Sequence, residues 1–281
     1  IVTTSIEHPS VSEALAGRNV TFVRADRSGP VEAAAVIDAL RPETRLVAVM
    51  LANNETGVVQ PVAEIAAACR ERGIHVHCDA VQGAGKIDID VELLGVDTLS
   101  LSAHKLHAPK GIGALYVRKG VTLAPHLVGG AQERRRRAGT ENVPLAAAFG
   151  AAARLASDPD VRRQVGALRD LFEAALPGDV TVNGAGVLRV PNTSSVTFHG
   201  ADGEGIVIAL DLSGVAVSTG SACSSGRVEP SRTLLGMGLS PEEAKSTVRF
   251  SLSRFTTAAE IDRVITLLGE LVPRCTMTGQ K

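Results

Sequence analysis

Short apolar runs and amphipathic segments alternate along the first half of the chain. Four β-rich apolar runs predict strands, at residues 45–51, 74–80, 96–104 and 113–120. Residues 62–73 place apolar side chains at helical spacing and end in Gly73, a residue type favoured just after a helix. Strands that alternate with helices in this way predict a mainly parallel α/β sheet flanked by helices.

The pattern changes near residue 143. Helical spacing predicts four helices, at residues 144–156, 161–176, 203–214 and 257–272. Two β-rich runs predict strands, at residues 194–200 and 215–220. We therefore expect a large domain at residues 1–145 and a smaller α+β domain at residues 146–281.

Composition narrows the function classes without choosing one. Apolar residues make up 44% and charged residues 21% of the 281 residues, as in ordinary globular proteins. The formal net charge is −1 and only 2% of residues are aromatic, so we expect no nucleic-acid surface. No apolar run approaches the roughly 20 residues that span a bilayer, so no membrane association is expected either.

The four cysteines are widely spaced and include no C-x-x-C pair: Cys69, Cys78, Cys223 and Cys275. This spacing indicates reduced thiols in a cytoplasmic protein rather than a disulfide framework. Cys69 falls in a predicted helix and Cys78 in a predicted strand, so both are expected to be buried and inert. Cys275 falls in a terminal segment expected to be frayed. Cys223 lies in a small, polar, Gly-flanked segment, which predicts an exposed loop whose thiol is able to ionise and react.

Polar residues follow three of the predicted strands. Parallel sheets bind ligands at the carboxyl ends of their strands, which directs attention to Asn53, Asp79 and Lys105. A lysine at this edge is able to lose solvent, lower its pKa and form a Schiff base with a carbonyl, although most lysines are simply solvated. Asp79 either holds a protonated ring nitrogen or caps the helix that follows. His8 either stacks on a flat ring or caps a helix beginning near Ser10.

Two further patterns suggest other functions that the spacing does not favour. In HVHC, His75 and His77 share one face of the predicted strand whereas Cys78 faces the other, so three ligands cannot converge and no metal site is expected. The four arginines at 134–137 are more typical of a solvated surface or a subunit contact than of RNA binding.

Seven segments occur in a fixed order along the chain: TSIEHPSV (4–11), ANNETGVVQPV (52–62), HCDAVQGAGK (77–86), SLSAHKLHAPKGIGALYVRKG (100–120), GGAQERRRRAGTENV (129–143), STGSACSSG (218–226) and VRFSLSRFT (248–256). Together they resemble the NifS/IscS-type cysteine desulfurases, a group of class-V aminotransferase relatives within the fold-type-I pyridoxal-phosphate enzymes. The resemblance covers nearly the whole chain. It implies a fold-type-I transferase with a large cofactor-binding domain, a smaller α+β C-terminal domain and bound pyridoxal 5'-phosphate.

Residue roles follow from the same resemblance. Lys105 resembles the lysine that holds the cofactor covalently, and Arg249 the arginine that grips the substrate carboxylate. Seven further residues resemble cofactor ligands: His8, Asn53, Asp79, Gln82, Ser102, His104 and Thr140. Among them, Asp79 corresponds to the partner of the ring nitrogen and Asn53 also to a substrate contact. Thr140 corresponds to a ligand donated to a neighbouring subunit, which implies a homodimer.

The implied reaction removes sulfur from L-cysteine and leaves L-alanine. Lys105 takes the α-proton, His104 is placed to assist, and the Cys223 thiolate receives the sulfur as a persulfide. The sulfur then passes to an acceptor protein. The long loop around Cys223 resembles the branch of the family whose acceptors are iron–sulfur scaffolds and tRNA-thiolating enzymes.

Departures from the family pattern leave alternatives open. The family's N-terminal portion, which includes a phosphate-binding segment, is expected to be absent, and Ala108 and Ser253 stand where the family usually has Gly. One alternative is another pyridoxal-phosphate enzyme, such as a selenocysteine lyase or an aminotransferase, although Cys223 argues against a transaminase. The other is an inactive remnant that only dimerises or binds a partner.

Overall fold

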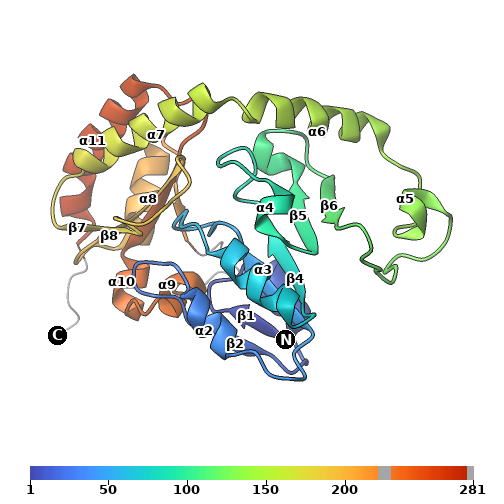
Figure 1. Ribbon diagram of the computed structural model, residues 1–281. Helices are drawn as coiled ribbons and strands as arrows, with labels where there is room; N and C mark the ends of the chain where they lie inside the picture. Colours follow the sequence, from blue (N-terminus) through green and yellow to red (C-terminus); the bar gives the residue numbers. More distant parts are fainter. Residues whose placement is uncertain (221–228, 277–281) are drawn as a thin grey trace.

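The computed structural model describes residues 1–220 and 229–276, and two β-sheets organise it (Figure 1). The first sheet has the strand order β2 (Thr21–Val23), β1 (Val2–Thr4), β3 (Leu46–Met50), β4 (His75–Asp79), β5 (Thr98–Ser102) and β6 (Gly113–Val117). All neighbouring pairs are parallel except β5 and β6, which are antiparallel. The prediction of a mainly parallel sheet flanked by helices is confirmed.

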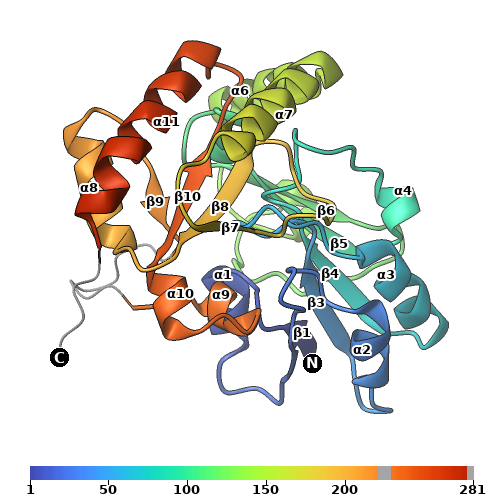
Figure 2. The same cartoon turned by 90° about the vertical axis from the view of Figure 1, so that its left-hand side faces the viewer.

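Burial explains why the central strands and their helices form. β3 is buried at four of its five positions, as expected of a strand covered on both faces. Helix α3 (Val62–Glu71) packs Val62, Ile65 and Cys69 into the same core, at the spacing of one helix face. Three further short helices accompany this sheet, namely α1 (Pro9–Ser12), α2 (Ala33–Asp38) and α4 (Val91–Leu94). Figures 1 and 2 show α2 and α3 side by side along the sheet.

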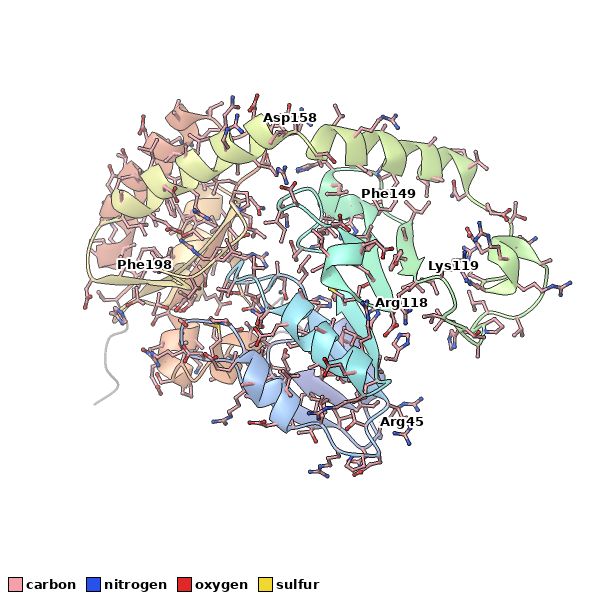
Figure 3. The ribbon with its side chains drawn as sticks, viewed as in Figure 1. Arg45, Arg118, Lys119, Phe149, Asp158 and Phe198 are labelled. Carbon is pink, nitrogen blue, oxygen red and sulfur yellow. The ribbon has the colours of Figure 1, made fainter. Side chains whose placement is uncertain are left out.

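The second sheet is antiparallel, with the order β7 (Val180–Asn183), β8 (Thr193–Phe198), β10 (Thr247–Ser251) and β9 (Ser218–Thr219). Three helices pack on it through a shared apolar core: α7 (Pro159–Ala174), α8 (Gly203–Leu212) and α11 (Ala258–Leu271). Phe172, Phe198 and Phe250 form the aromatic centre of this core, and Figure 3 labels Phe198. This part has the α+β character that was predicted.

A small third cluster joins the two sheets. Helices α9 (Arg232–Gly236) and α10 (Pro241–Lys245) bury Leu234 and Met237 against Ile6 and Met50 of the first sheet's region. The Ser5 hydroxyl donates a hydrogen bond to the Gly236 carbonyl at 3.1 Å. The second sheet is therefore anchored beside the ends of β1 and β3, where the predicted site lies.

A long arm leaves the first sheet after β6 and returns through α6 (Val143–Ala156). Residues 118–142 include the short helix α5 (Gln132–Arg135), which Figure 1 shows far from α7 and α8. Helix α6 has no buried residue although its sequence is almost entirely apolar. It lines an apolar groove of about 630 Å³ together with β5 and β6 of the first sheet, although the predicted boundary at residue 145 assigns α6 to the second domain. The exact domain boundary stays a prediction.

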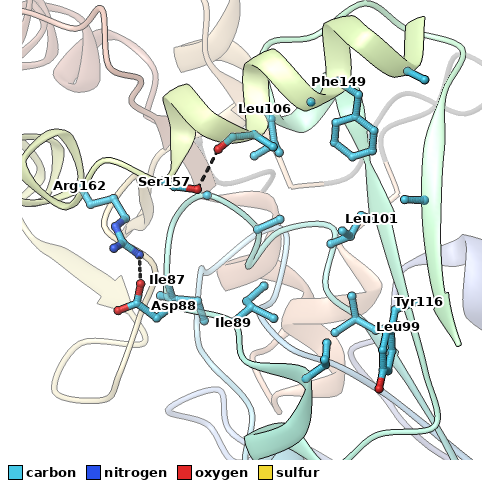
Figure 4. A pocket seen from close by; sticks show the side chains of 17 residues that line it. Ile87, Asp88, Ile89, Leu99, Leu101, Leu106, Tyr116, Phe149, Ser157 and Arg162 are labelled. Carbon is cyan, nitrogen blue, oxygen red and sulfur yellow. Dashed lines mark hydrogen bonds and ion pairs between the residues drawn. The ribbon is translucent and has the colours of Figure 1, made fainter. Parts of the chain in front are cut away.

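Figure 4 shows this groove, with Phe149 of α6 above Leu101 and Tyr116. The Arg162–Asp88 ion pair, at 2.7 Å, lies at its edge. We call this space the α6 groove. It is lined mainly by apolar side chains, so it is distinct in chemistry from the polar cavity described below.

The described cysteines differ from one another in environment. Cys69 and Cys78 are fully buried, as predicted, and burial raises the pKa of both thiols. The Cys275 carbonyl accepts a hydrogen bond from the Asp202 amide at 2.7 Å, so the expectation of a frayed end at Cys275 is wrong. Cys223 lies outside the described residues.

No helix within the described ranges is both long and apolar enough to cross a membrane.

Candidate functional site

The carboxyl ends of β3, β4 and β5 meet at one edge of the first sheet. Met50 pairs with Asp79 across β3 and β4, and Asp79 pairs with Ser100 across β4 and β5. Paired residues of neighbouring strands face the same side, and Ser102, two residues after Ser100, shares that side. The loops that leave these strands therefore place their polar side chains around a common space.

Lys105 belongs to a one-turn 3₁₀ helix, Ala103–Leu106, that directly follows β5. Ala103 and Leu106 are buried and anchor the turn, which leaves His104 and Lys105 on its open side. Partial burial, followed by the positive charge of Arg249, lowers the pKa of Lys105. A larger fraction of this amine is thus neutral, and able to act as a base or nucleophile, than in an ordinary solvated lysine.

A cavity of about 360 Å³ opens in front of Lys105. Its walls come from both sheets and include Asn54, Gln82, Lys86, His104, Lys105 and Arg249. The volume is in the range of small-molecule and cofactor sites. Four of the residues selected from the sequence, namely Gln82, His104, Lys105 and Arg249, are brought together here.

Arg249 reaches the cavity from β10 of the second sheet. Its Nη1 donates to the Asn54 carbonyl at 3.0 Å, whereas its buried Nε has no hydrogen-bond partner among residues 1–220 and 229–276. Burial lowers the pKa of this guanidinium, and the nearby Glu55 carboxyl opposes that shift. An arginine with an unused donor in a cavity wall is suited to bind a carboxylate.

Glu55 connects Arg249 to the ends of the segment that contains Cys223. Its buried carboxylate accepts a hydrogen bond from Ser231 Oγ, and a Cβ added to Gly220 would lie only 2.0 Å from Glu55 Oε2. Burial raises the pKa of Glu55, against the effect of hydrogen bonds from Ser231 and Thr233. Gly220, three residues before Cys223, therefore packs directly against Glu55, whose charge acts on Arg249.

The two adjacent asparagines have different roles. Asn53 is buried, its Oδ1 accepts the backbone N–H groups of Glu55 and Thr56, and its Nδ2 donates to the Ile6 carbonyl and Met50 Sδ. Asn53 thus has no polar hydrogen left for a ligand, in contrast to its predicted cofactor and substrate role. Asn54 instead lines the cavity, and its buried Oδ1 has no partner among the described residues.

Sequence reasoning missed Asn54. The sequence did contain a signal for it. An asparagine often organises a turn by accepting hydrogen bonds from the backbone amides two and three residues later, and Asn53 is followed by Glu55 and Thr56 at those positions. The neighbour of such a turn-forming residue is then the one free to face a ligand.

Asp79, Ser102 and His8 lie near the cavity without lining it. Asp79 Oδ1 accepts the Val81 amide at 3.0 Å and so holds the turn after β4, while Asp79 remains on the open face of β4. Residues 80–90 contain no helix for Asp79 to cap. Ser102 Oγ is hydrogen-bonded to His104 Nδ1 at 2.8 Å. His8 Nδ1 accepts the Ser10 amide at 3.1 Å and caps α1, which is the alternative role considered for it.

Thr140 is exposed in the arm, away from the cavity, and Cys223 is outside the described ranges. His75 and His77 share one face of β4, as predicted, and both hydrogen-bond to Thr98 Oγ1. The described part of the chain contains no group of three His, Cys, Asp or Glu side chains arranged to hold a metal ion.

The donor set at this edge fits pyridoxal 5'-phosphate. Lys105 offers an amine of lowered pKa, Gln82 an amide, and the Ser102–His104 pair a hydroxyl and an imidazole suited to phosphate oxygens. The Asp79 carboxylate lies at the end of the adjacent strand, where a protonated ring nitrogen requires an anion. Asn54 Oδ1 and Arg249 Nε, which have no partner among residues 1–220 and 229–276, leave polar capacity for a substrate.

Comparisons with known proteins agree with this geometry. The aminotransferase class-V family matches residues 1–264. The chain is 45% identical to cysteine desulfurase 2 of Trichormus variabilis over 285 aligned positions, which cover 98% of this chain and 71% of that protein. Among solved structures, the NifS-like protein of Rickettsia africae has a TM-score of 0.88 at 31% identity, covering 96% of this chain and 74% of that one. SspA in complex with cysteine has a TM-score of 0.79 at 34% identity, covering 91% and 74%.

Proposed function

The chain belongs to the class-V aminotransferase family and, within it, to the cysteine desulfurases, and from this premise we propose that it removes sulfur from L-cysteine, leaving L-alanine and a persulfide on Cys223. Enzymes of this family use pyridoxal 5'-phosphate, whose ring, when bound, draws electrons away from the substrate Cα. The observation that carries the proposal is the shared cavity in which Lys105 and Arg249 meet.

Arg249 binds the substrate carboxylate in this proposal. Its guanidinium offers paired donors to the two carboxylate oxygens, and its Asn54 contact fixes its direction. We assign Asn54, rather than Asn53, to the substrate side because its Oδ1 is the one without a partner in the described ranges.

Lys105 takes the proton from the substrate Cα at its Nζ. The lowered pKa makes the neutral amine more available near neutral pH, which is what a general base requires. His104, the next residue in the same turn, is exposed beside it, and burial and neighbouring lysines lower the pKa of its imidazole. His104 therefore assists proton transfer in its neutral form.

The remaining ligands would hold the cofactor when it is bound. Asp79 would pair with the ring nitrogen, Gln82 would donate to the ring hydroxyl, and Ser102 with His104 would bind the phosphate. His8, at the cap of α1, would stack on the ring.

We assign Thr140 to the phosphate of a second copy of the chain. The arm that carries Thr140 is exposed, and Glu133, Arg134 and Arg135 within it adopt left-handed backbone conformations. Such conformations cost energy for non-glycine residues and persist where surrounding contacts hold them. A homodimer supplies those contacts.

Cys223 receives the sulfur: the thiolate attacks the sulfur of cysteine, an S–S bond forms, the C–S bond breaks, and the released carbon centre is protonated to alanine. Gly220 packs beside Glu55, whose charge acts on Arg249. Cys223 follows Gly220 by three residues, and three residues of chain span at most about 11 Å. The persulfide sulfur then passes to an acceptor protein of iron–sulfur cluster assembly or tRNA thiolation in the cytoplasm.

Replacement of Cys223 tests the proposal. Cys223→Ser retains cofactor binding but loses sulfide and alanine formation from L-cysteine, because serine does not accept a sulfur atom. Cys275→Ser is the matched control, since Cys275 is partly exposed but far along the chain from the cavity residues, and it retains wild-type turnover. Full turnover in Cys223→Ser would remove Cys223 from the mechanism.

A further inference from the structure

A second lysine, Lys86, lines the same cavity as Lys105 and has no role in the mechanism above. It ends the turn that follows β4, where its amide donates to the Gly83 carbonyl at 3.0 Å. Gly85, its neighbour, packs so tightly that an added Cβ would lie 2.7 Å from both Ala156 and Leu106. The backbone that carries Lys86 is therefore wedged between α6 and the Lys105 turn.

The Lys86 side chain has a specific partner. Lys86 Nζ donates a hydrogen bond to Gln82 Oε1, one helical turn earlier in the chain. A primary amide has one accepting oxygen and one donating nitrogen, on opposite sides of the same group. Because Lys86 occupies the oxygen, the Gln82 Nε2 hydrogens are the ones left for the cavity.

The charges around Lys86 are compatible with a lasting contact between Lys86 and Gln82. Lys105 and Arg249 both face it, and burial together with their positive charges lowers the pKa of Lys86 to about 7. Lys86 therefore exchanges its proton near neutral pH, yet both of its protonation states carry an N–H for Gln82 Oε1. The contact with Gln82 is thus maintained while the net positive charge of the cavity changes.

We propose that Lys86 is a positioning residue that fixes the orientation of the Gln82 amide, so that Gln82 Nε2 donates to the cofactor's ring oxygen. The inference rests on the proposed function, because it assigns Lys86 to the same cofactor site. Lys86 acts through Gln82, so its effect depends on the presence of that amide.

A double-mutant cycle tests this dependence. Lys86→Met removes the donor with little change in volume, Lys86→Arg keeps a donor, and Gln82→Met removes the amide. The measurements are the dissociation constant for pyridoxal 5'-phosphate, by absorbance titration, and the pH midpoint of the visible band of the bound cofactor. Lys119→Met, at an exposed lysine just after β6, is the matched control.

Lys86→Met is expected to weaken cofactor binding about tenfold, the worth of one oriented hydrogen bond, and to shift the pH midpoint. Lys86→Arg and Lys119→Met stay close to wild type, and Lys86→Met causes no further loss of cofactor affinity in the Gln82→Met background. An equal loss in both backgrounds, or no loss in the wild-type background, overturns the inference. Lys86→Leu replaces Lys86→Met if the latter does not fold.

The wild-type protein separates the two proposals. If it forms no visible band with pyridoxal 5'-phosphate, the proposed function fails. If it forms the band and the Lys86 variants bind the cofactor as wild type does, only the role of Lys86 fails.

Discussion

Two residues in the cavity wall, Arg249 and Asn54, have polar atoms without a hydrogen-bond partner among the described residues, and Arg249 also carries a positive charge. Arg249 Nε and Asn54 Oδ1 are both buried and unpaired in the described part of the chain. Leaving such atoms unpaired costs about 1–3 kcal/mol each. Two of the residues that line the cavity are therefore among those whose buried polar atoms the described part of the fold does not satisfy.

Arg249→Lys tests substrate recognition at this scale. Lysine keeps the charge but loses the planar pair of donors, so the KM for L-cysteine is expected to rise about tenfold or more with a smaller change in kcat. Steady-state alanine formation measures both constants. Arg232→Lys, an exposed arginine paired with Glu13, is the control and keeps the wild-type KM. An unchanged KM in Arg249→Lys would remove the arginine from substrate binding.

Glu7 is a buried acid whose titration opposes folding. Burial raises the pKa of Glu7 to about 8, from an ordinary 4.5, and hydrogen bonds from Thr4 and Met50 only partly offset this. The folded chain thus holds a proton that the unfolded chain releases between these two pH values. This difference lowers the free energy of unfolding by up to about 1.4 kcal/mol per pH unit as the pH rises from 4.5 to 8.

Glu7→Gln is expected to flatten that decline, because glutamine does not titrate and its Oε1 accepts the same two hydrogen bonds. Urea unfolding at a series of pH values between 4.5 and 8 measures the slope. Glu32→Gln, at an exposed glutamate, retains the wild-type slope. The same slope in Glu7→Gln as in wild type would contradict the assignment.

Helices and strands show which parts of the fold the sequence could predict. β3, β4, β5 and the helices α3, α8 and α11 fall within the predicted segments, because long periodic patterns dominate local preference. α6 and α7 begin one and two residues before theirs. Strands β1, β2 and β7 have three or four residues each, too short for a period to be recognised. The motif at residues 248–256 contains most of β10, but no strand is predicted there; in the structure Arg249 is partly buried between the buried Val248 and Phe250.

α11 offers a test at the scale of an element. Thr257 and Glu260 form a reciprocal capping box at its first turn, with the Glu260 amide donating to Thr257 Oγ1 at 3.3 Å. Thr257→Ala is expected to cost about 1 kcal/mol in the free energy of unfolding. Urea unfolding measures this loss. Thr266→Ala, in the exposed interior of the same helix, costs little or nothing, and equal costs at both positions would contradict the role of the cap.

The whole molecule places its candidate site where its two sheets meet. The first sheet supplies Gln82, His104 and Lys105, and the second supplies Arg249, so neither sheet has the complete cavity wall. Sequence motifs identified these residues individually. Their convergence depended on how the second sheet docks through α9 and α10, which no local pattern encodes.

The α6 groove is a second feature of the whole molecule. Phe149 of α6 is only partly buried in this groove, between α6 and the first sheet. Open apolar grooves of this kind bind the dye ANS. Phe149→Asp is expected to reduce ANS fluorescence about twofold or more, because it places a charge among the apolar side chains that line the groove. Leu212→Asp, at an exposed leucine of α8, leaves the signal unchanged. Equal dye binding by wild type and Phe149→Asp would show that the dye binds elsewhere.

The central claim is that Lys105, and not the other cavity lysine, carries the cofactor. Borohydride reduction of the protein loaded with pyridoxal 5'-phosphate, followed by peptide mass spectrometry, locates the attachment directly. The account predicts a single pyridoxyl adduct on the peptide that contains Lys105. An adduct on Lys86, or no adduct in protein shown to be folded, would contradict it.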